Sequence, residues 1–402
     1  DNIISDGRPS LGFTGNMDTY KPAEGSATRS DIAITDPDFK YPSLWKSNIA
    51  ADYKFGDGWV ATVELLYSKD INAIYHDNIG LYRTEQFVND GGAGNARPYY
   101  NGYYSDREGN QKAANHVVML RNTSKGHSLY TTFQLQKNFV DGILKGLYLN
   151  GSYSFGQSRG VTDGTSSVAT SAWKYRAALD GNAEEVGYTA GSFDGRLLLS
   201  ASYTANWSKY AATSFGLIYQ RYRPFRYSYC YNGDANGDSQ FSNDLMYIPA
   251  NFDEVKDHLL PGDFDSQEDA WKAMNAFIEQ DPYLSKHRGE YAERNGAVAP
   301  FANQLDLSVS HDIKIYQKNG RSHTLRFSFN IANFLNLLNR NWGVVQTTVL
   351  GNQQYQFLTI PKGQGPSAAN NYTLKYTMAK DLDETFKDNL NDVSRWQMQF
   401  GI

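Results

Sequence analysis

The feature that most constrains the fold of this chain is an alternation of apolar and polar residues with a period of two. For example, Val63 and Leu65 alternate with Thr62 and Glu64. Period two is typical of a β-strand whose two faces meet different surroundings. The pattern recurs in residues 43–55, 59–68, 129–136, 147–155, 197–207, 211–219, 305–313, 325–331 and 396–402. We therefore predict an all-β fold.

The connections between these segments alternate between short and long. Short turns, such as residues 56–58 and Asn319-Gly320, join the two members of each pair. The long, polar connections are 69–127, 156–195, 220–302 and 333–393. Outer-membrane β-barrels have short periplasmic turns and long extracellular loops, whereas a soluble sandwich has no reason to follow this rule. The pattern predicts an antiparallel transmembrane β-barrel with long extracellular loops.

The composition of the 402 residues agrees with this class, since 14% are aromatic although the mean hydropathy is -0.58. The net charge of -5 leaves no basic surplus for a phosphate backbone, so we expect no nucleic-acid partner. No apolar run approaches the length of a membrane-spanning helix. Cys230 is the single cysteine, which excludes an internal disulfide and a Cys/His zinc framework.

Charge indicates which face of the strands would meet lipid. A Lys or Arg on the lipid face at mid-membrane costs about 2–4 kcal/mol, so the charged face is expected to line the lumen. The candidate lumen-facing residues are Lys46, Asp52, Glu64, Asp306, Arg326 and Arg395. Lys137 and His311 are exceptions on the opposite face. Aromatic residues near strand ends suit an interfacial belt, and the candidates are Trp45, Phe55, Trp59, Trp207 and Tyr210.

One long connection carries candidate ligands for calcium. Asp234, Asn236 and Asp238 occupy alternate positions, as the first oxygen ligands of a calcium loop do, and Asp244 follows. The alternative is an Asx-rich turn that folds on itself, because Ser239 stands where such loops have glycine. The histidines lack zinc-ligand spacing, and the sequence contains no Gly-x-Ser-x-Gly elbow. We assign no catalytic residue and do not expect an enzyme.

The connection 220–302 contains two further features. Ser266 and Asp269 form a capping-box pattern that predicts a loop helix. Its apolar stripe, which either packs on neighbouring loops or docks a surface lipoprotein, consists of Ala270, Trp271, Met274, Phe277 and Ile278. Tyr227, Tyr229 and Tyr231 form either an aromatic ligand platform or the outer end of a long strand.

Three motifs suggest a family. They are NGDANGD at 232–238 with NDLMYIP at 243–249, the residues RNG, APF and NQLD within 294–306, and NIANFLNLLN at 330–339 with NWG at 341–343. Together they resemble the C-terminal barrel portion of TonB-dependent outer-membrane transporters, in particular the Oar-like and SusC-like branch.

The resemblance implies a barrel of about 22 strands in the Gram-negative outer membrane. Residues 1–402 would form its C-terminal part, with the plug and N-terminal domain outside this sequence. The resemblance also implies that the candidate lumen-facing residues contact the plug. The implied activity is import of a bulky nutrient ligand, with energy supplied by the TonB motor through the plug. Alternative functions are an outer-membrane scaffold that binds a surface lipoprotein or other partner proteins without transport, and a secreted, soluble β-protein that binds glycans through its aromatic residues.

Overall fold

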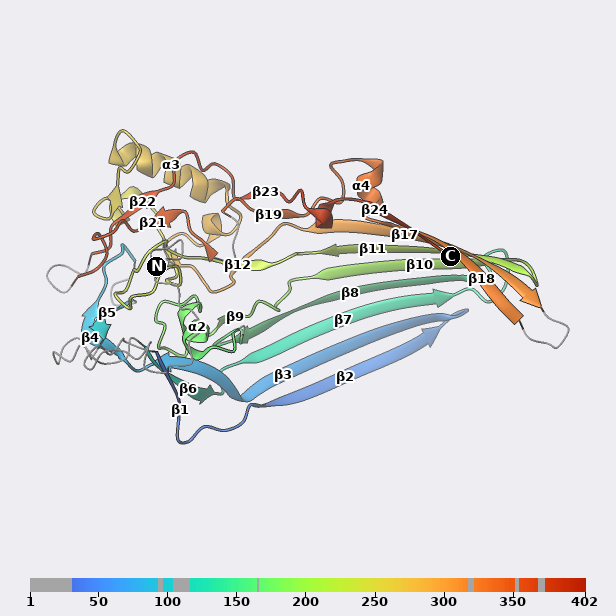
Figure 1. Cartoon of the computed structure of the whole chain (residues 1–402), viewed down its shortest axis with the longest axis horizontal. Helices are drawn as coiled ribbons and strands as arrows, with labels where there is room; N and C mark the ends of the chain where they lie inside the picture. Colours follow the sequence, from blue (N-terminus) through green and yellow to red (C-terminus); the bar gives the residue numbers. More distant parts are fainter. Residues whose placement is uncertain are drawn as a thin grey trace, which may run out of the picture.

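A computed structural model describes residues 31–92, 97–103, 116–164, 166–316, 322–350, 354–367 and 373–402. The predicted turn at Asn319-Gly320 and parts of the predicted long connections lie outside these residues. The described chain forms a curved sheet of long strands, with a group of short elements packed at one end of these strands (Figure 1). We call that group the loop cap and define it as the described parts of 81–103, 161–195, 223–301 and 345–388.

The main sheet has 12 strands, and its long neighbouring strands are antiparallel. The strands are β1 (Ile32–Thr35), β2 (Ser43–Phe55), β3 (Trp59–Asn78), β6 (Val117–Thr123), β7 (His127–Asn138), β8 (Leu147–Gly160), β9 (Gly187–Tyr188), β10 (Arg196–Ser208), β11 (Ala211–Tyr222), β17 (Ala302–Tyr316), β18 (Ser322–Ala332) and β24 (Gln397–Gly401). Within the described residues the sheet stays open, because β2 pairs only with β3 and β24 only with β18.

The other elements are short. The strands are β4 (Leu81–Phe87), β5 (Pro98–Tyr103), β12 (Arg226–Tyr229), β13 (Tyr247–Ile248), β14 (Leu259–Leu260), β15 (Glu290–Tyr291), β16 (Ala297–Val298), β19 (Gln346–Thr348), β20 (Gln354–Tyr355), β21 (Leu358–Thr359), β22 (Tyr376–Met378) and β23 (Phe386–Asp388). The helices are α2 (Ala169–Lys174), α3 (Gln267–Gln280), α4 (Phe334–Leu338) and the 3-10 turns η1 (Phe252–Glu254), η2 (Leu284–Lys286) and η3 (Asp392–Ser394). Among the helices in the described ranges, none combines the length and the apolar character required to cross a bilayer.

The prediction of a β-rich chain is confirmed, since each alternating segment contains or overlaps a strand of the main sheet. β3 runs further than the predicted segment 59–68 and ends at Asn78. The charged residues Lys69 and Asp70 do not end this strand, because they lie next to the bend between β6 and β7. There the Asp70 amide donates to the Gly126 carbonyl (3.0 Å), and beyond the bend β3 pairs with β6.

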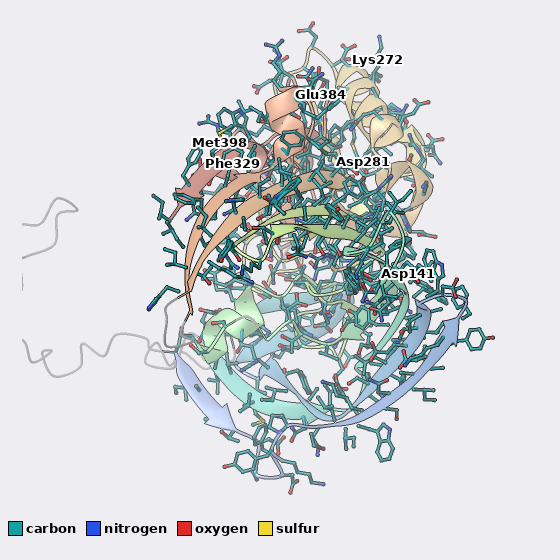
Figure 2. All side chains as sticks on the ribbon, turned by 90° about the vertical axis from the view of Figure 1, so that its right-hand side faces the viewer. Asp141, Lys272, Asp281, Phe329, Glu384 and Met398 are labelled. Carbon is teal, nitrogen blue, oxygen red and sulfur yellow. The ribbon has the colours of Figure 1, made fainter. Side chains whose placement is uncertain are left out.

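The two faces of the main sheet differ as the alternation predicts. Odd-numbered residues of β2, β3, β7, β8, β10, β11, β17 and β18 form what we call the apolar face, and even-numbered residues form the polar face. Large side chains of the apolar face are exposed, with Trp45 at 62%, Leu199 at 43% and Phe327 at 41%. In Figure 2, Phe329 of this face lies beside Met398 of β24 at the outer edge of the sheet. A sandwich core would bury these side chains.

On the polar face, side chains of neighbouring strands hydrogen-bond to one another. Examples are Gln134 with Asn150 (2.9 Å) and Ser308 with Asn330 (2.7 Å). Such side-chain pairs between neighbouring strands stabilise the sheet in addition to its backbone hydrogen bonds. The polar face therefore satisfies many of its own donors and acceptors.

The structure explains the two exceptions on the apolar face. Lys137 lies at the turn end of β7, where its ammonium donates to the Asp57 carbonyl and lies 5.5 Å from the Trp59 ring centroid. His311 Nδ1 is 2.8 Å from Thr213 Oγ1, which also accepts a hydrogen bond from the Trp207 indole (2.7 Å). Each polar group is thus satisfied by a neighbour on the same surface.

The main hydrophobic core of the described chain lies in the loop cap. Helix α3 begins at the predicted cap, with Ser266 accepting a hydrogen bond from the Asp269 amide. Its residues Ala270, Met274, Phe277 and Ile278 are buried, and Trp271 packs against the same core. Of the two predicted uses of this stripe, the structure places it inside the molecule against neighbouring loops.

A buried carboxylate joins three segments of the loop cap. Asp281, labelled in Figure 2, accepts hydrogen bonds from the Tyr229 hydroxyl (2.6 Å) and the Thr385 hydroxyl (2.8 Å) through Oδ2. Its other oxygen accepts from the amides of Tyr283 and Leu284. These bonds connect β12, the end of α3 and the segment before β23.

Candidate ligand-binding site

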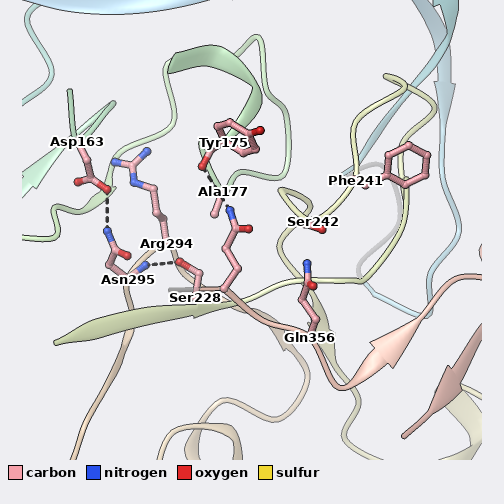
Figure 3. A pocket seen from close by; sticks show the side chains of 10 residues that line it. Asp163, Tyr175, Ala177, Ser228, Phe241, Ser242, Arg294, Asn295 and Gln356 are labelled. Atoms are coloured by element: carbon pink, nitrogen blue, oxygen red, sulfur yellow. Dashed lines mark hydrogen bonds between the residues drawn. The ribbon is translucent and has the colours of Figure 1, made fainter. Parts of the chain in front are cut away.

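A cavity of about 530 Å³ opens among separate segments of the loop cap (Figure 3). Its lining is mostly polar and consists of Asp163, Tyr175, Ala177, Ser228, Phe241, Ser242, Arg294, Asn295, Gln354 and Gln356. Its volume lies in the range of about 300–1,000 Å³ that is typical of small-molecule sites, although most such sites have a more apolar lining. We call it the cap cavity.

Asn295 is held at one side of the cap cavity by three hydrogen bonds. Its backbone amide donates to Ser228 Oγ (2.8 Å), and its side-chain amide donates to Asp163 Oδ2 (3.0 Å) and the Tyr188 carbonyl (2.9 Å). Asn295 has φ of 52° and Ser242, across the lining, has φ of 81°. Left-handed backbone at residues other than glycine costs about 1–3 kcal/mol and is concentrated at functional sites.

Two buried arginines belong to this region: Arg294, which is itself a lining residue, and Arg176, which follows the lining residue Tyr175. Arg294 donates to the carbonyls of Val161 (2.5 Å), Gly160 and Gly187, and Arg176 also donates to the Val161 carbonyl (3.2 Å). Burial, together with repulsion from Arg294, lowers the pKa of Arg176 to about 10. Burial likewise lowers the pKa of Arg294. Within the described ranges neither guanidinium has a carboxylate within ion-pair distance, and the Nε of each has no hydrogen-bond partner.

Two aromatic side chains of the cap cavity are exposed, unlike most aromatics of the loop cap. Tyr175 is 62% exposed and Phe241 is 66% exposed. Gln354 and Gln356 donate to the carbonyls of Tyr175 and Tyr231 (each 3.3 Å), which fixes the two amides near the opening. Aromatic rings beside amide, hydroxyl and charged groups suit a ligand with both apolar faces and many hydrogen-bonding groups.

Ser228 is a lining residue whose hydroxyl already has a hydrogen-bond partner. Its Oγ accepts from the Asn295 amide, and no histidine is among the described lining residues. A serine nucleophile needs a base within hydrogen-bond reach, and no histidine of the described lining provides one for Ser228.

The predicted calcium residues lie in one loop beside the cap core. Asp234 accepts from the amides of Asn236 (3.1 Å), Gly237 (2.6 Å) and Ser239 (2.8 Å), and Asp244 accepts from the Ala235 amide (2.8 Å). These contacts are those of an Asx-rich turn. Ser239 adopts φ of 65°, where a calcium loop would have glycine.

The charge of this loop is only partly compensated. Arg97 is completely buried and pairs with both Asp90 and Asp244 (each 3.1 Å). Burial raises the pKa of Asp244 to about 7, although Arg97 opposes this shift. Burial and the neighbouring carboxylates Asp244 and Asp234 raise the pKa of Asp238 well above its usual range.

Two buried oxygens in the same loop, Gln240 Oε1 and Asn243 Oδ1, have no hydrogen-bond partner in the described chain. A cation would suit this surplus of oxygen and negative charge. In the described ranges, however, no three His, Cys, Asp or Glu side chains converge as a metal cluster requires. The calcium site therefore stays a prediction.

The predicted lumen residues lie mainly on the polar face. Asp52 accepts from Thr62 (2.5 Å), Glu64 accepts from Asn48 (2.7 Å), and Asp306 accepts from the Asn333 amide (2.8 Å). Arg326 donates to both carboxylate oxygens of Asp312 (2.6 and 2.8 Å). Lys46 lies opposite Ser68 in the β2–β3 ladder.

Arg395, which is predicted to face the lumen, lies just before the final strand rather than in it. The 3-10 turn η3 precedes it, and the Arg395 amide donates to the Asp392 carbonyl (3.2 Å). This bond keeps the chain in a turn, so β24 begins only at Gln397. Arg395 is exposed just before that strand.

The predicted belt residues lie at strand ends. Phe55 and Trp59 flank the β2–β3 turn with stacked rings, 6.2 Å between centroids. Trp207 and Tyr210 flank the β10–β11 turn, and Trp45 lies near the other end of β2.

Tyr227, Tyr229 and Tyr231 form neither an open platform nor the end of a long strand. β11 ends at Tyr222, and the three tyrosines are almost fully buried in the cap core. Their rings pack on Tyr355, Phe357 and Tyr376, which come from the last long connection. Periodicity within one segment cannot reveal partners that are so distant in sequence.

The cap cavity could not be predicted from the sequence. Its lining is contributed by several separate long connections, most of which have no periodic pattern. The one signal was the RNG motif at residues 294–296, which supplies two lining residues. Comparison with known proteins finds no matching family model, no matching curated protein and no matching solved structure.

Proposed function

We propose that the chain is part of an outer-membrane β-barrel that belongs to a TonB-dependent importer of a bulky nutrient ligand. The observation that carries this proposal is the exposed apolar face. In β3 the exposed or half-exposed apolar residues extend from Trp59 to Tyr67, which at the usual strand rise is about 27 Å. With a strand tilt of about 35–45°, this length gives an apolar band of about 20 Å, near the height of about 25 Å in known outer-membrane barrels.

The polar face would then line the lumen. Asp52, Glu64, Asp306 and Arg326 would be available there to hydrogen-bond a plug, and Phe55, Trp59, Trp207 and Tyr210 would lie at the periplasmic membrane interface. The TonB motor would act on the plug. In this proposal the motifs at 232–249, 294–306 and 330–343 reflect the Oar-like and SusC-like branch.

The cap cavity would capture the ligand before import. Its mixture of exposed aromatic rings and fixed amides favours a polar oligomer, such as a glycan or a peptide, over a small apolar compound. A calcium ion held by Asp234, Asn236, Asp238 and Asp244 would stabilise the adjacent loop by offsetting its buried negative charge.

Extraction of cells that express the chain tests the membrane placement. The chain is expected to stay with outer membranes after detergent-free extraction, and release as a soluble monomer would contradict the proposal.

Glycan and peptide arrays test capture of the ligand by the cap cavity. We expect binding to be lost in a Tyr175→Ala/Phe241→Ala variant and kept in Tyr41→Ala, since Tyr41 is 90% exposed outside the cap cavity. Recovery of stoichiometric partner proteins without any ligand uptake would instead favour a scaffold.

A further inference from the structure

The turn between β7 and β8, residues 139–146, exposes apolar side chains at the end of the sheet away from the loop cap. Ile143 is 100% exposed, Val140 67% and Leu144 49%. The turn is well defined, because the Phe139 amide donates to the Leu147 carbonyl (2.9 Å) and the Gly146 amide donates to the Phe139 carbonyl (2.9 Å).

Other described turns at this end of the sheet are polar. Residues 56–58 read Gly-Asp-Gly, and the β10–β11 connection is Lys209-Tyr210, which follows Ser208 at the end of β10. An aqueous turn needs no exposed Val, Ile or Leu, and fully exposing one such side chain forfeits about 1.5–3 kcal/mol of burial free energy. The apolar character of the 139–146 turn is therefore specific to it.

The position of the turn indicates what covers it. In the strand order β3-β7-β8-β10, this turn lies between the end of β3, which carries Trp59, and the end of β10, which carries Trp207. The turn also continues the apolar face of β7, since Phe139 lies two positions after Lys137. The Lys137 ammonium lies 5.0 Å from the Phe139 ring centroid. Lys145 adds a second cation within the turn.

We propose that the 139–146 turn inserts its apolar side chains into the headgroup and acyl-chain boundary of the adjacent lipid leaflet, and so anchors this rim of the sheet in the membrane. Apolar residues beside lysines are the usual composition of segments that lie in a lipid interface. Continuity with the apolar face and the flanking aromatics favours lipid over a protein partner. The inference rests on the membrane placement in the proposed function.

Spin labels can test the anchor, because the single native cysteine, Cys230, is completely buried and gives little labelling background. Nitroxides would be attached to Ile143→Cys and, as a second reporter of the turn, to Val140→Cys. Ile49→Cys, on the apolar face and 70% exposed, reports the lipid placement of the sheet, and Lys209→Cys reports a polar turn. The full chain would be placed in vesicles of phosphatidylethanolamine and phosphatidylglycerol.

The measurement is the relaxation of each label by oxygen, which partitions into lipid, and by a water-soluble nickel complex. We expect the labels at 143 and 140 to be relaxed several-fold more by oxygen than by nickel, as at 49, whereas nickel dominates at 209. If 49 is in lipid but 143 and 140 behave as 209 does, the anchor is wrong and the membrane placement stands. Shielding of 143 and 140 from both reagents in native membranes would indicate a protein partner and would overturn the proposal. If 49 itself is in water, the proposed function fails.

Discussion

The main sheet and the loop cap use the same kinds of side chains in opposite ways. The sheet exposes Phe133 at 48% and Val63 at 43%, while the cap buries Phe277 and Tyr229 almost completely. The cap thus has the core of a water-soluble protein, stabilised by removal of apolar area from water. The sheet has its hydrogen-bonded ladder and two unlike surfaces. With the membrane placement that we propose, this single chain would depend on two different solvents, lipid and water, for its stability.

The largest effect is expected from emptying the cap core. Phe277→Ala should lower the free energy of unfolding by about 3–5 kcal/mol, because it leaves a cavity in a closely packed cluster. Phe133→Ala, on the apolar face, removes the same atoms from an exposed position and should cost much less. Denaturant unfolding of both variants in detergent micelles measures the difference. Equal losses would mean that the two regions are not stabilised differently.

Buried and exposed charges give a second comparison. Arg97→Leu should cost about 3–5 kcal/mol, because it leaves Asp90 and Asp244 buried without their cation. Arg83→Leu breaks an ion pair with Asp180 whose arginine is 53% exposed, and should cost about 0–1 kcal/mol. Thermal unfolding of the two variants is the measurement. An Arg97 variant as stable as the Arg83 variant would show that another group compensates the carboxylates.

Charge placed on the two faces of the sheet tests their surroundings directly. Val63→Arg introduces a cation on the apolar face and should cost about 2–4 kcal/mol in a membrane. Thr62→Arg places the same side chain on the polar face, next to Asp52, and should be tolerated. The readout is the fraction of each variant that assembles into outer membranes. Tolerance of Val63→Arg would indicate that water or protein, not lipid, covers the apolar face.

A fourth comparison concerns pH. Since burial raises the pKa of Asp244 to about 7, the folded loop holds a proton that the unfolded chain releases near pH 4. The unfolding free energy of the cap should therefore fall as pH rises from about 4 to about 7. Asp244→Asn should flatten this dependence. Thermal unfolding at both pH values, with calcium or with a chelator, also tests the metal prediction, because a bound ion should reduce the loss near neutral pH.

Features of the fold could be predicted where the surroundings of a residue depend on its nearest neighbours in the chain. In a strand, odd-numbered and even-numbered residues lie on opposite faces, as Val63 and Thr62 do. The strands and their two faces could therefore be predicted. The cap could not be predicted in the same way, because Tyr229 packs on Tyr355 and Phe357, more than a hundred positions away. Its cavity depends equally on distant segments, as with Asn295 and Asp163. Local patterns found only short-range features there, such as the Ser266 cap.

The position of Asp281 has a mechanical consequence. One carboxylate accepts hydrogen bonds from the Tyr229 hydroxyl, the Thr385 hydroxyl and the backbone amides at the start of η2, so a segment that swings away gives up its own buried hydrogen bond. Leaving a buried polar group unpaired costs about 1–3 kcal/mol. We therefore expect the three segments to stay together at Asp281 when the surrounding loops move.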